Sequence, residues 1–259
     1  MNYGLQISAS GALSSMYRQD VLANNLANGT TVGFKPDLVA FQARDCARRE
    51  DGLGFLPSNR LLERLGGGVF PAANRVDFEQ GPLERTNGPL DVALEGSGFF
   101  VVRAGTTGDA DTLRLTRDGR FTLNANGQLV LAANGSPVLD DKDRPISLPP
   151  GAKVTIDGDG TIRDGTEPIA RLRIVDVPDR ARLQKKEGGM YVAGANAASS
   201  FVAATATVKQ RHVEQAAVDE VSTMMGIAGA GRDFEANIAM MQHADRLMER
   251  AINTFGRLG

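Results

Sequence analysis

The sequence predicts an α+β protein in which N- and C-terminal α-helices pair as a coiled coil, with an all-β domain of short antiparallel strands inserted between them. Three observations predict this class. All 11 prolines lie between Pro36 and Pro178, so only the two ends of the chain lack the residue most hostile to a helix. Apolar residues recur at helical spacing at both ends. In the middle they alternate with polar residues and are separated by turn dipeptides.

The same observations divide the 259 residues into four segments. We expect an N-terminal helix and assembly segment at 1–35, an extended connection at 36–86, a β domain at 87–205 and a C-terminal coiled-coil helix at 206–259. The connection is charged and glycine-rich, and a short helix is expected inside it at residues 59–65.

The N-terminal helix is predicted by a heptad seam, in which apolar residues are spaced alternately by 4 and 3. The seam consists of Leu5, Ala9, Ala12, Met16, Gln19, Ala23 and Leu26. Only Gln19 is polar. The run from Asn24 to Thr31 then concentrates residues that bond to the backbone or tolerate positive φ, so we expect the helix to end there.

The C-terminal seam is longer and runs from Val213 to Phe255 without a break in the spacing. Its apolar positions are Val213, Ala217, Met224, Ile227, Phe234, Ile238, Met241, Met248, Ile252 and Phe255. A helix of this length would extend roughly 64 Å, which is more than a compact domain of this size can cover. The helix therefore needs a partner.

Between the ends, short runs of β-favouring residues predict strands. These runs lie at 99–102, 113–115, 121–123, 129–131, 154–156 and 172–177. Tight turns are expected at Asp118-Gly119, Asn126-Gly127 and Asn134-Gly135, and in the run from Asp157 to Thr161. That last run lacks the further acidic ligands of a calcium loop, so we interpret it as a hairpin turn.

Composition excludes several classes of function. With 29 basic and 31 acidic residues the net charge is −2, so no nucleic-acid partner is expected. No apolar run approaches the ~18 residues of a membrane span, and no cleaved secretory signal is expected, because the first thirty residues lack a basic head with an apolar stretch. A single cysteine, Cys46, and two histidines leave little for metal or acid/base chemistry. We therefore expect no enzyme activity, no cofactor and no direct membrane insertion.

The two seams are expected to pair with each other and to leave apolar flanks that neighbouring copies cover. This predicts an assembly interface formed by Leu5, Ala9, Ala12, Met16, Ala23, Leu26, Val213, Met224, Ile227, Phe234, Ile238, Met241, Met248, Ile252 and Phe255. The alternative is a soluble β-domain binding module whose helices form a small closed coiled-coil oligomer.

Several motifs resemble those of bacterial flagellar rod and hook proteins. The run from Asn24 to Lys35 resembles their signature NNLANxxTxGFK, and the run from Pro89 to Val102 is similar to PLDxAIxGxGFFxV. Similar blocks follow in family order at 116–130, 188–191 and 232–235. The family-motif residues are Asn24, Asn25, Leu26, Ala27, Asn28, Gly33, Phe34, Lys35, Gly96, Gly98, Phe99 and Phe100. The run 211–217 departs from the family's usual start of the last helix, and Gly29 replaces a Val or Ala.

The resemblance implies a structural subunit of the flagellar basal-body rod, the axial drive shaft that crosses the periplasm. It implies polymerisation through the terminal helices, partners among the other rod and hook proteins, and export through the flagellar type III apparatus directed by an uncleaved N-terminus. One inserted β domain resembles the distal or proximal rod proteins, and the long connection at 41–86 favours the distal type.

Overall fold

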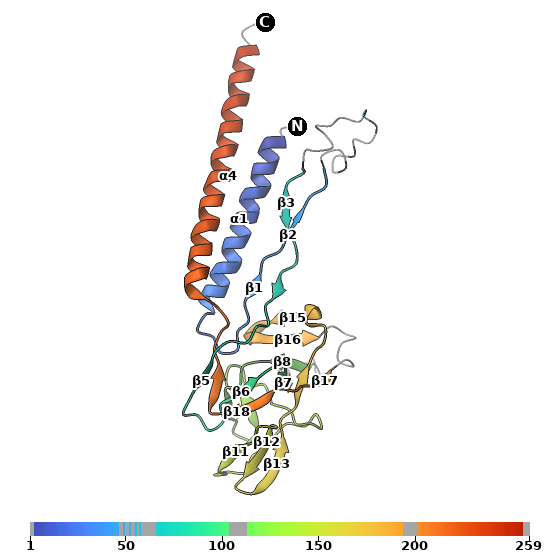
Figure 1. The fold of residues 1–259 in the computed structure, drawn as a ribbon, viewed down its shortest axis with the longest axis vertical. Helices are drawn as coiled ribbons and strands as arrows, with labels where there is room; N and C mark the ends of the chain where they lie inside the picture. The colour runs from blue at the N-terminus through green and yellow to red at the C-terminus, as the bar shows by residue number, and fades with distance from the viewer. Residues whose placement is uncertain are drawn as a thin grey trace. The chain divides into compact units, whose positions relative to one another are not determined.

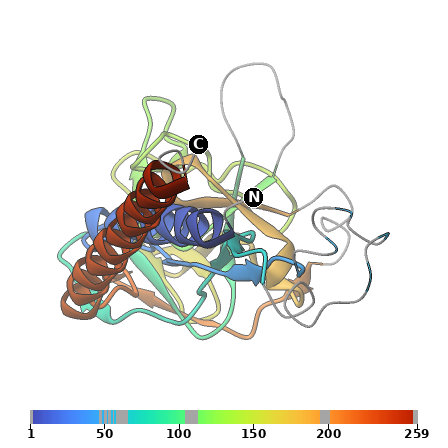
Figure 2. The same ribbon diagram turned by 90° about the horizontal axis from the view of Figure 1, so that it is seen from above.

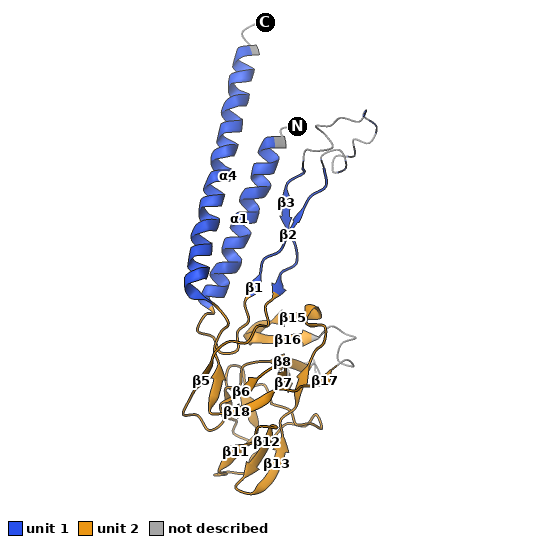
Figure 3. Cartoon of the chain, in the orientation of Figure 1, with its two compact units in different colours: residues 1–27, 37–75, 219–259 blue, residues 28–36, 76–218 orange. Residues whose placement is uncertain are grey.

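The computed structural model describes residues 3–46, 49, 52, 55, 57, 66–103, 113–193 and 201–255. The helix expected at 59–65 lies outside these residues. The chain divides into two compact units (Figure 3). Unit 1 comprises residues 1–27, 37–75 and 219–259, and unit 2 comprises residues 28–36 and 76–218.

Unit 1 contains the two predicted helices. Helix α1 (Tyr3–Ala27) and helix α4 (Glu220–Phe255) lie side by side in Figures 1 and 2 and run antiparallel, because Gly11 lies beside Asn237 and Leu22 beside Gly226. A hairpin of β2 (Phe41–Ala43) and β3 (Val69–Pro71) packs against α1 through β3. Two further short strands are β1 (Asp37–Leu38) and β4 (Arg75–Val76), of which Val76 belongs to unit 2.

The end of α1 agrees with the prediction, but the start of α4 does not. Helix α4 begins at Glu220, and Asp219 caps it by accepting a hydrogen bond from the backbone N–H of Ser222 at 3.1 Å. Val213, predicted to start the helical seam, instead lies in strand β19 (His212–Glu214). It is paired there with Glu84 of β5 (Leu83–Arg85). Pairing with a distant strand overrides the heptad spacing at this point.

Unit 2 contains the antiparallel strands expected in the middle of the chain, but it comprises residues 28–36 and 76–218, which is more than the expected 87–205. In the described part of the chain its largest sheet has six strands in the order β15-β16-β8-β7-β14-β17. These strands are β15 (Leu183–Lys186), β16 (Met190–Ala193), β8 (Leu113–Thr116), β7 (Phe99–Arg103), β14 (Ile174–Asp176) and β17 (Val202–Ala203). Short 3-10 turns, η2 (Arg180–Arg182) and η3 (Glu187–Gly189), flank β15.

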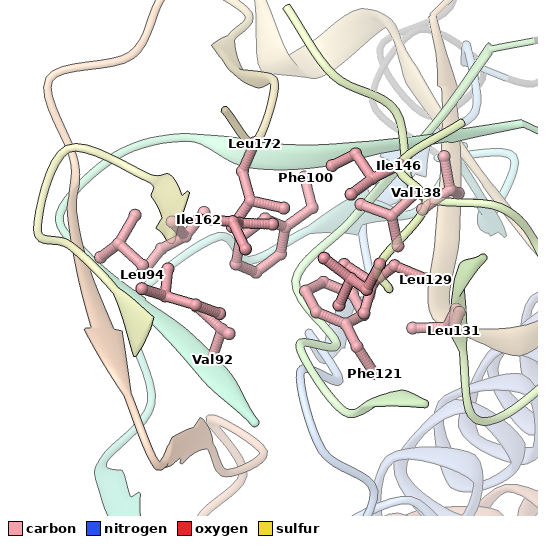
Figure 4. Close-up of a cluster of buried hydrophobic side chains, with 14 residues drawn as sticks. Val92, Leu94, Phe100, Phe121, Leu129, Leu131, Val138, Ile146, Ile162 and Leu172 are labelled. Carbon is pink, nitrogen blue, oxygen red and sulfur yellow. The ribbon is translucent and has the colours of Figure 1, made fainter. Parts of the chain in front are cut away.

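Smaller antiparallel sheets complete unit 2. They pair β6 (Val92–Glu95) with β18 (Thr207–Gln210), β9 (Phe121–Leu123) with β10 (Leu129–Leu131), and β11 (Val154–Ile156) with β12 (Thr161–Asp164), which also pairs with β13 (Glu167–Arg171). Aliphatic and aromatic side chains from most of these strands form one buried cluster (Figure 4).

Strand β7 serves two cores because successive side chains of a strand point to opposite faces. Phe100 belongs to the cluster of Figure 4 and packs edge-on against Phe121. Phe99 belongs to a second cluster, where its ring contacts Phe78 and Tyr191. The two adjacent phenylalanines of the family motif therefore anchor the sheet on both faces.

Most of the predicted turns are present. Gly127, with φ of 71°, closes the turn between β9 and β10, and the run from Asp157 to Thr161 joins β11 to β12. The hairpin predicted at Asp118-Gly119 is wrong, because β8 and β9 flank it without pairing with each other. The Gly119 carbonyl instead accepts a hydrogen bond from the Val92 N–H at 2.9 Å, so this turn connects two sheets.

Candidate functional site

Small residues set the approach of the two helices in unit 1. A Cβ atom added to Gly11 would lie 2.6 Å from Oδ1 of Asn237, and one added to Gly226 would lie 3.1 Å from a methyl group of Leu22. Ala230 is buried, and it is the only such residue in the described part of α4. A side chain at Gly11 or Gly226 would have to displace the side chain of Asn237 or Leu22, so these glycines leave room for the neighbouring helix.

Many residues of the predicted seams are buried or half-buried on the pair of helices α1 and α4. Ala12 is buried, and the half-buried members are Leu5, Ala9, Leu26, Ile227, Phe234, Ile238 and Met241. The structure therefore brings these residues onto one pair of helices. Their part in assembly stays a prediction.

Other predicted interface residues are exposed on the same helices. They are Met16 and Ala23 on α1, and Met224, Met248 and Ile252 on α4. The side chain of Phe255 lies outside the described part of the structure. Large apolar side chains that the seam did not include are also exposed, namely Leu13, Val221, Met225, Met240 and Leu247. Methionine is unbranched and adapts to irregular partner surfaces, so this surface suits binding to another protein.

The first part of the signature motif forms the last turn of α1. Asn24, Leu26 and Ala27 belong to this turn together with Asn25, which is buried. The Asn25 side chain donates to the Asp37 carbonyl and accepts from the Asp37 N–H, both at 2.9 Å. This pair of bonds imitates a backbone ladder and holds the chain beyond the helix against its last turn.

The second part of the motif is buried in unit 2. Thr31 closes a turn by donating from its N–H to the Asn28 carbonyl at 3.0 Å. Gly33 has φ of 69°, and a Cβ atom there would lie 2.5 Å from the Asp118 nitrogen, so both conformation and space require glycine. The Phe34 ring is buried, with the Lys185 ammonium 3.9 Å from its centroid.

Lys35, the last residue of the motif, enters a buried charged cluster formed by Lys35, Arg117 and Glu214. Its Nζ donates to Oε1 of Glu214 and to the Glu79 carbonyl, both at 2.5 Å. The other oxygen of Glu214, Oε2, accepts from Nη1 of Arg117 at 3.1 Å. Side-chain exposure is 1% for Lys35, 3% for Arg117 and 0% for Glu214.

Further hydrogen bonds complete the cluster. The Gly81 N–H donates to Oε1 of Glu214 at 3.1 Å, and Nη2 of Arg117 donates to the Gly96 carbonyl at 2.8 Å. Gly96, with φ of 103°, and Gly98 form the turn before β7, where a Cβ atom on Gly98 would lie 2.7 Å from Cβ of Ala204. The motif glycines therefore place backbone groups where the cluster and the sheet need them.

Burial dominates the electrostatics of this cluster. It lowers the pKa of the Lys35 ammonium, opposed by the Glu214 carboxylate, and it lowers the pKa of the Arg117 guanidinium in the same way. Two cations share one carboxylate away from solvent, so no substrate can reach these groups. Their role is structural, because they join the segment that follows α1 to the strand that precedes α4.

The sequence pattern did not point to Arg117 and Glu214 as partners of Lys35. A lysine between Phe34 and Pro36 was the available signal, because a cation in an apolar run needs a buried partner. Its partner Glu214 is 179 residues away in the chain, and sequence spacing alone does not reveal such a pair.

The run from Asp157 to Thr161, which was compared with a calcium loop, forms a turn between β11 and β12. Arg163 and Asp157 form an ion pair at 2.5 Å, and the Asp159 carboxylate accepts from the Thr161 N–H at 3.0 Å. Within the described residues no group of three or more His, Cys, Asp or Glu side chains is arranged to hold a metal ion. No helix in the described part of the chain is both long and apolar enough to cross a bilayer.

Two family models match the chain. Residues 93–163 match the model described as the flagellar hook protein FlgE/F/G D1 domain. Residues 209–254 match the model described as the flagellar basal body rod FlgEFG protein C-terminal region. These matches cover strands of unit 2 and almost all of α4.

Whole-chain relatives carry names of the same kind. The chain is 32% identical over 259 residues to the flagellar basal-body rod protein FlgF of Caulobacter vibrioides, covering 100% of both chains. It is 27% identical to FlgF of Salmonella typhimurium, covering 97% of each chain. It is 28% identical to the basal-body rod protein FlgG of Buchnera aphidicola from Schizaphis graminum, covering 95% of this chain and 97% of the relative. Relatives of both names match along nearly all of this chain, and the distal type that the 41–86 connection favours stays a prediction.

Proposed function

The chain belongs to the flagellar basal-body rod protein family, which is structural and not enzymatic, and we propose that it polymerises helically through α1 and α4 into the rod. The polymer would be the axial drive shaft of the basal body in the periplasm. The exposed apolar surface of the helix pair is the observation that carries this proposal.

The physical reason is the cost of leaving this surface in water. Val221, Met225 and Ile252 are each at least 69% exposed, and burial of an apolar side chain is worth about 1.5–3 kcal/mol. Contacts between unlike surfaces of identical copies continue into an open helical filament when the rotation does not close. Many such contacts add together, so a shaft built from weak contacts can transmit torque.

The proposed partners follow from this assembly. They are further copies of the chain, the other flagellar rod and hook proteins, and the flagellar type III export apparatus. Relatives of both names are called basal-body rod proteins, which supports a place among several rod components. Export would be directed by the uncleaved N-terminus, and no cofactor takes part.

Deletion of residues 220–259 tests the proposal, because it removes α4 and retains Glu214 in its cluster. The shortened chain is introduced into bacteria that lack the native gene, with the full chain as control. We expect a chain that keeps β structure by circular dichroism but is absent from isolated basal bodies, in cells that do not swim. Normal motility with the shortened chain would refute the proposal.

Sedimentation of the purified full chain at rising concentration separates polymerisation from the alternative. Open-ended growth in size supports a shaft. A fixed small oligomer supports a soluble β-domain binding module closed by a coiled coil.

A further inference from the structure

A groove in unit 1 lies between α1, α4 and the β2–β3 hairpin. We call it the helix–hairpin groove, and its volume is about 370 Å³. The side chains that matter for binding are Ser14, Ser15, Arg18, Phe41, Val69 and Asp233. Phe41 and Val69 are exposed, so an apolar ligand can contact them directly.

Ser14 adds a polar group to the lining of the groove. Only 6% of its surface is exposed, it lines the groove, and its Oγ has no hydrogen-bond partner. A buried hydroxyl without a partner has lost its hydrogen bonds to water and has gained none in return, which is unfavourable. By contrast, Ser10, one turn earlier on α1, donates to the Ile7 carbonyl at 2.8 Å. A ligand with a hydrogen-bond acceptor would remove the cost at Ser14.

The groove also carries one charge of each sign. Arg18 and Asp233 both line it and are exposed, and within the described chain neither forms an ion pair. A complementary ligand therefore presents apolar side chains flanked by both an acidic and a basic group.

The end of α4 has this chemistry. Counting along the two antiparallel helices from the contact between Gly11 and Asn237, the first residue of α1, Tyr3, is level with Asp245. Beyond that point α4 continues without a described residue of α1 beside it, as Figure 1 shows. This overhang consists of residues 246–255. It exposes Leu247, Met248 and Ile252 and carries the charged residues Arg246, Glu249 and Arg250.

We propose that the helix–hairpin groove binds the overhang of α4 from a second copy of this chain. Met248 and Ile252 lie on one helical face and contact Phe41 and Val69. Glu249 on the same face pairs with Arg18, and a basic residue of the overhang pairs with Asp233. The last carbonyls of a helix lack intrahelical donors, so one of them accepts from Ser14. The proposal rests on the polymerisation proposed above and states which surfaces meet.

Cysteine cross-linking tests the contact between copies. In a Cys46→Ser background, one chain carries Ser15→Cys in the groove and the other carries Asn253→Cys in the overhang. Both are expressed in cells that lack the native gene, and isolated basal bodies are oxidised. The matched control replaces Ser15→Cys with Leu13→Cys, an exposed position two residues away on another face of α1. We expect a mixed disulfide dimer with Ser15→Cys and its loss with Leu13→Cys.

Each other outcome has a distinct meaning. If both chains are present in basal bodies but Ser15→Cys gives no more mixed dimer than Leu13→Cys, the groove proposal is wrong and the proposed function stands. If Ser15→Cys links only to itself, α1 faces α1 and the groove proposal is again wrong. If wild-type chain is also absent from basal bodies, both proposals fail.

Discussion

At the residue scale, the charged cluster of Lys35, Arg117 and Glu214 explains why the signature motif ends in lysine. The three side chains come from segments far apart in the chain and meet away from solvent. Burying charges is costly, so such a cluster is not in itself a source of large stability. It is nevertheless costly to break, because removal of one partner leaves an uncompensated charge.

Glu214→Gln is expected to lower the free energy of unfolding by about 3–5 kcal/mol, because it leaves two buried cations without their carboxylate. Urea unfolding followed by circular dichroism measures the change. Glu95→Gln is the matched control, since Glu95 pairs with Lys209 on the surface at 2.8 Å and its loss should cost less than about 1 kcal/mol. Equal effects of the two variants would contradict the assigned role of the cluster.

A second prediction at this scale concerns acid stability. Burial raises the pKa of Asp140, but hydrogen bonds from Arg144 and from the Lys142 N–H outweigh it, so the folded pKa lies below the ordinary 3.8. The Asp140 carboxylate therefore contributes its full stabilisation at pH values above 3.8. This contribution is lost as the pH falls through the folded pKa. Asp140→Asn should be less stable than wild type at pH 7, with a shallower loss of stability in acid. Parallel urea midpoints from pH 7 to pH 2.5 would contradict this.

At the element scale, glycines of the two helices have different roles. Gly11 of α1 faces Asn237, whereas a Cβ atom on Gly231 of α4 would meet no atom within 4 Å. The same substitution should therefore have opposite effects. Gly231→Leu is expected to stabilise the helix pair by roughly 0.8 kcal/mol through helix propensity. Gly11→Leu is expected to destabilise it, because the new side chain needs the space that Asn237 occupies.

Thermal unfolding at 222 nm and hydrogen exchange of α4 amides measure both changes. The two variants share the same chemical change, so a difference between them reports helix contact and not propensity. Equal stabilisation by both would mean that α1 and α4 do not pack closely at Gly11.

At the scale of the whole molecule, variants of two neighbouring methionines test helix pairing and assembly independently. Met241 is half-buried on the helix pair, and Met240 is 61% exposed. Met241→Asp should weaken helix pairing, because a carboxylate becomes partly buried without a partner. Met240→Asp should leave hydrogen exchange of α4 unchanged and reduce the amount of chain in isolated basal bodies. If Met240→Asp is incorporated into basal bodies as fully as wild type, Met240 does not belong to the assembly surface.

The apolar spacing from Leu5 to Leu26 and from Met224 to Ile252, the strand runs and most turn dipeptides were sufficient to predict two helices and an antiparallel β domain. Local periodicity and turn chemistry determine such elements, and both are visible in the sequence. The family motifs were equally readable because they are contiguous in the chain. The exposed apolar residues of α4 were predicted only in part. The heptad spacing includes Met224, but it omits the neighbouring Met225, which is also exposed.

Only the tertiary structure decided where α4 begins and what Lys35 contacts. Val213 fits the helical spacing, yet its backbone pairs with β5, and Glu214 beside it meets Lys35 and Arg117. Strand pairing and buried charge pairs join residues that are distant in sequence. The free energy of these interactions depends on which groups meet in space and are removed from water together. The spacing of residues along the chain does not reveal which groups these are.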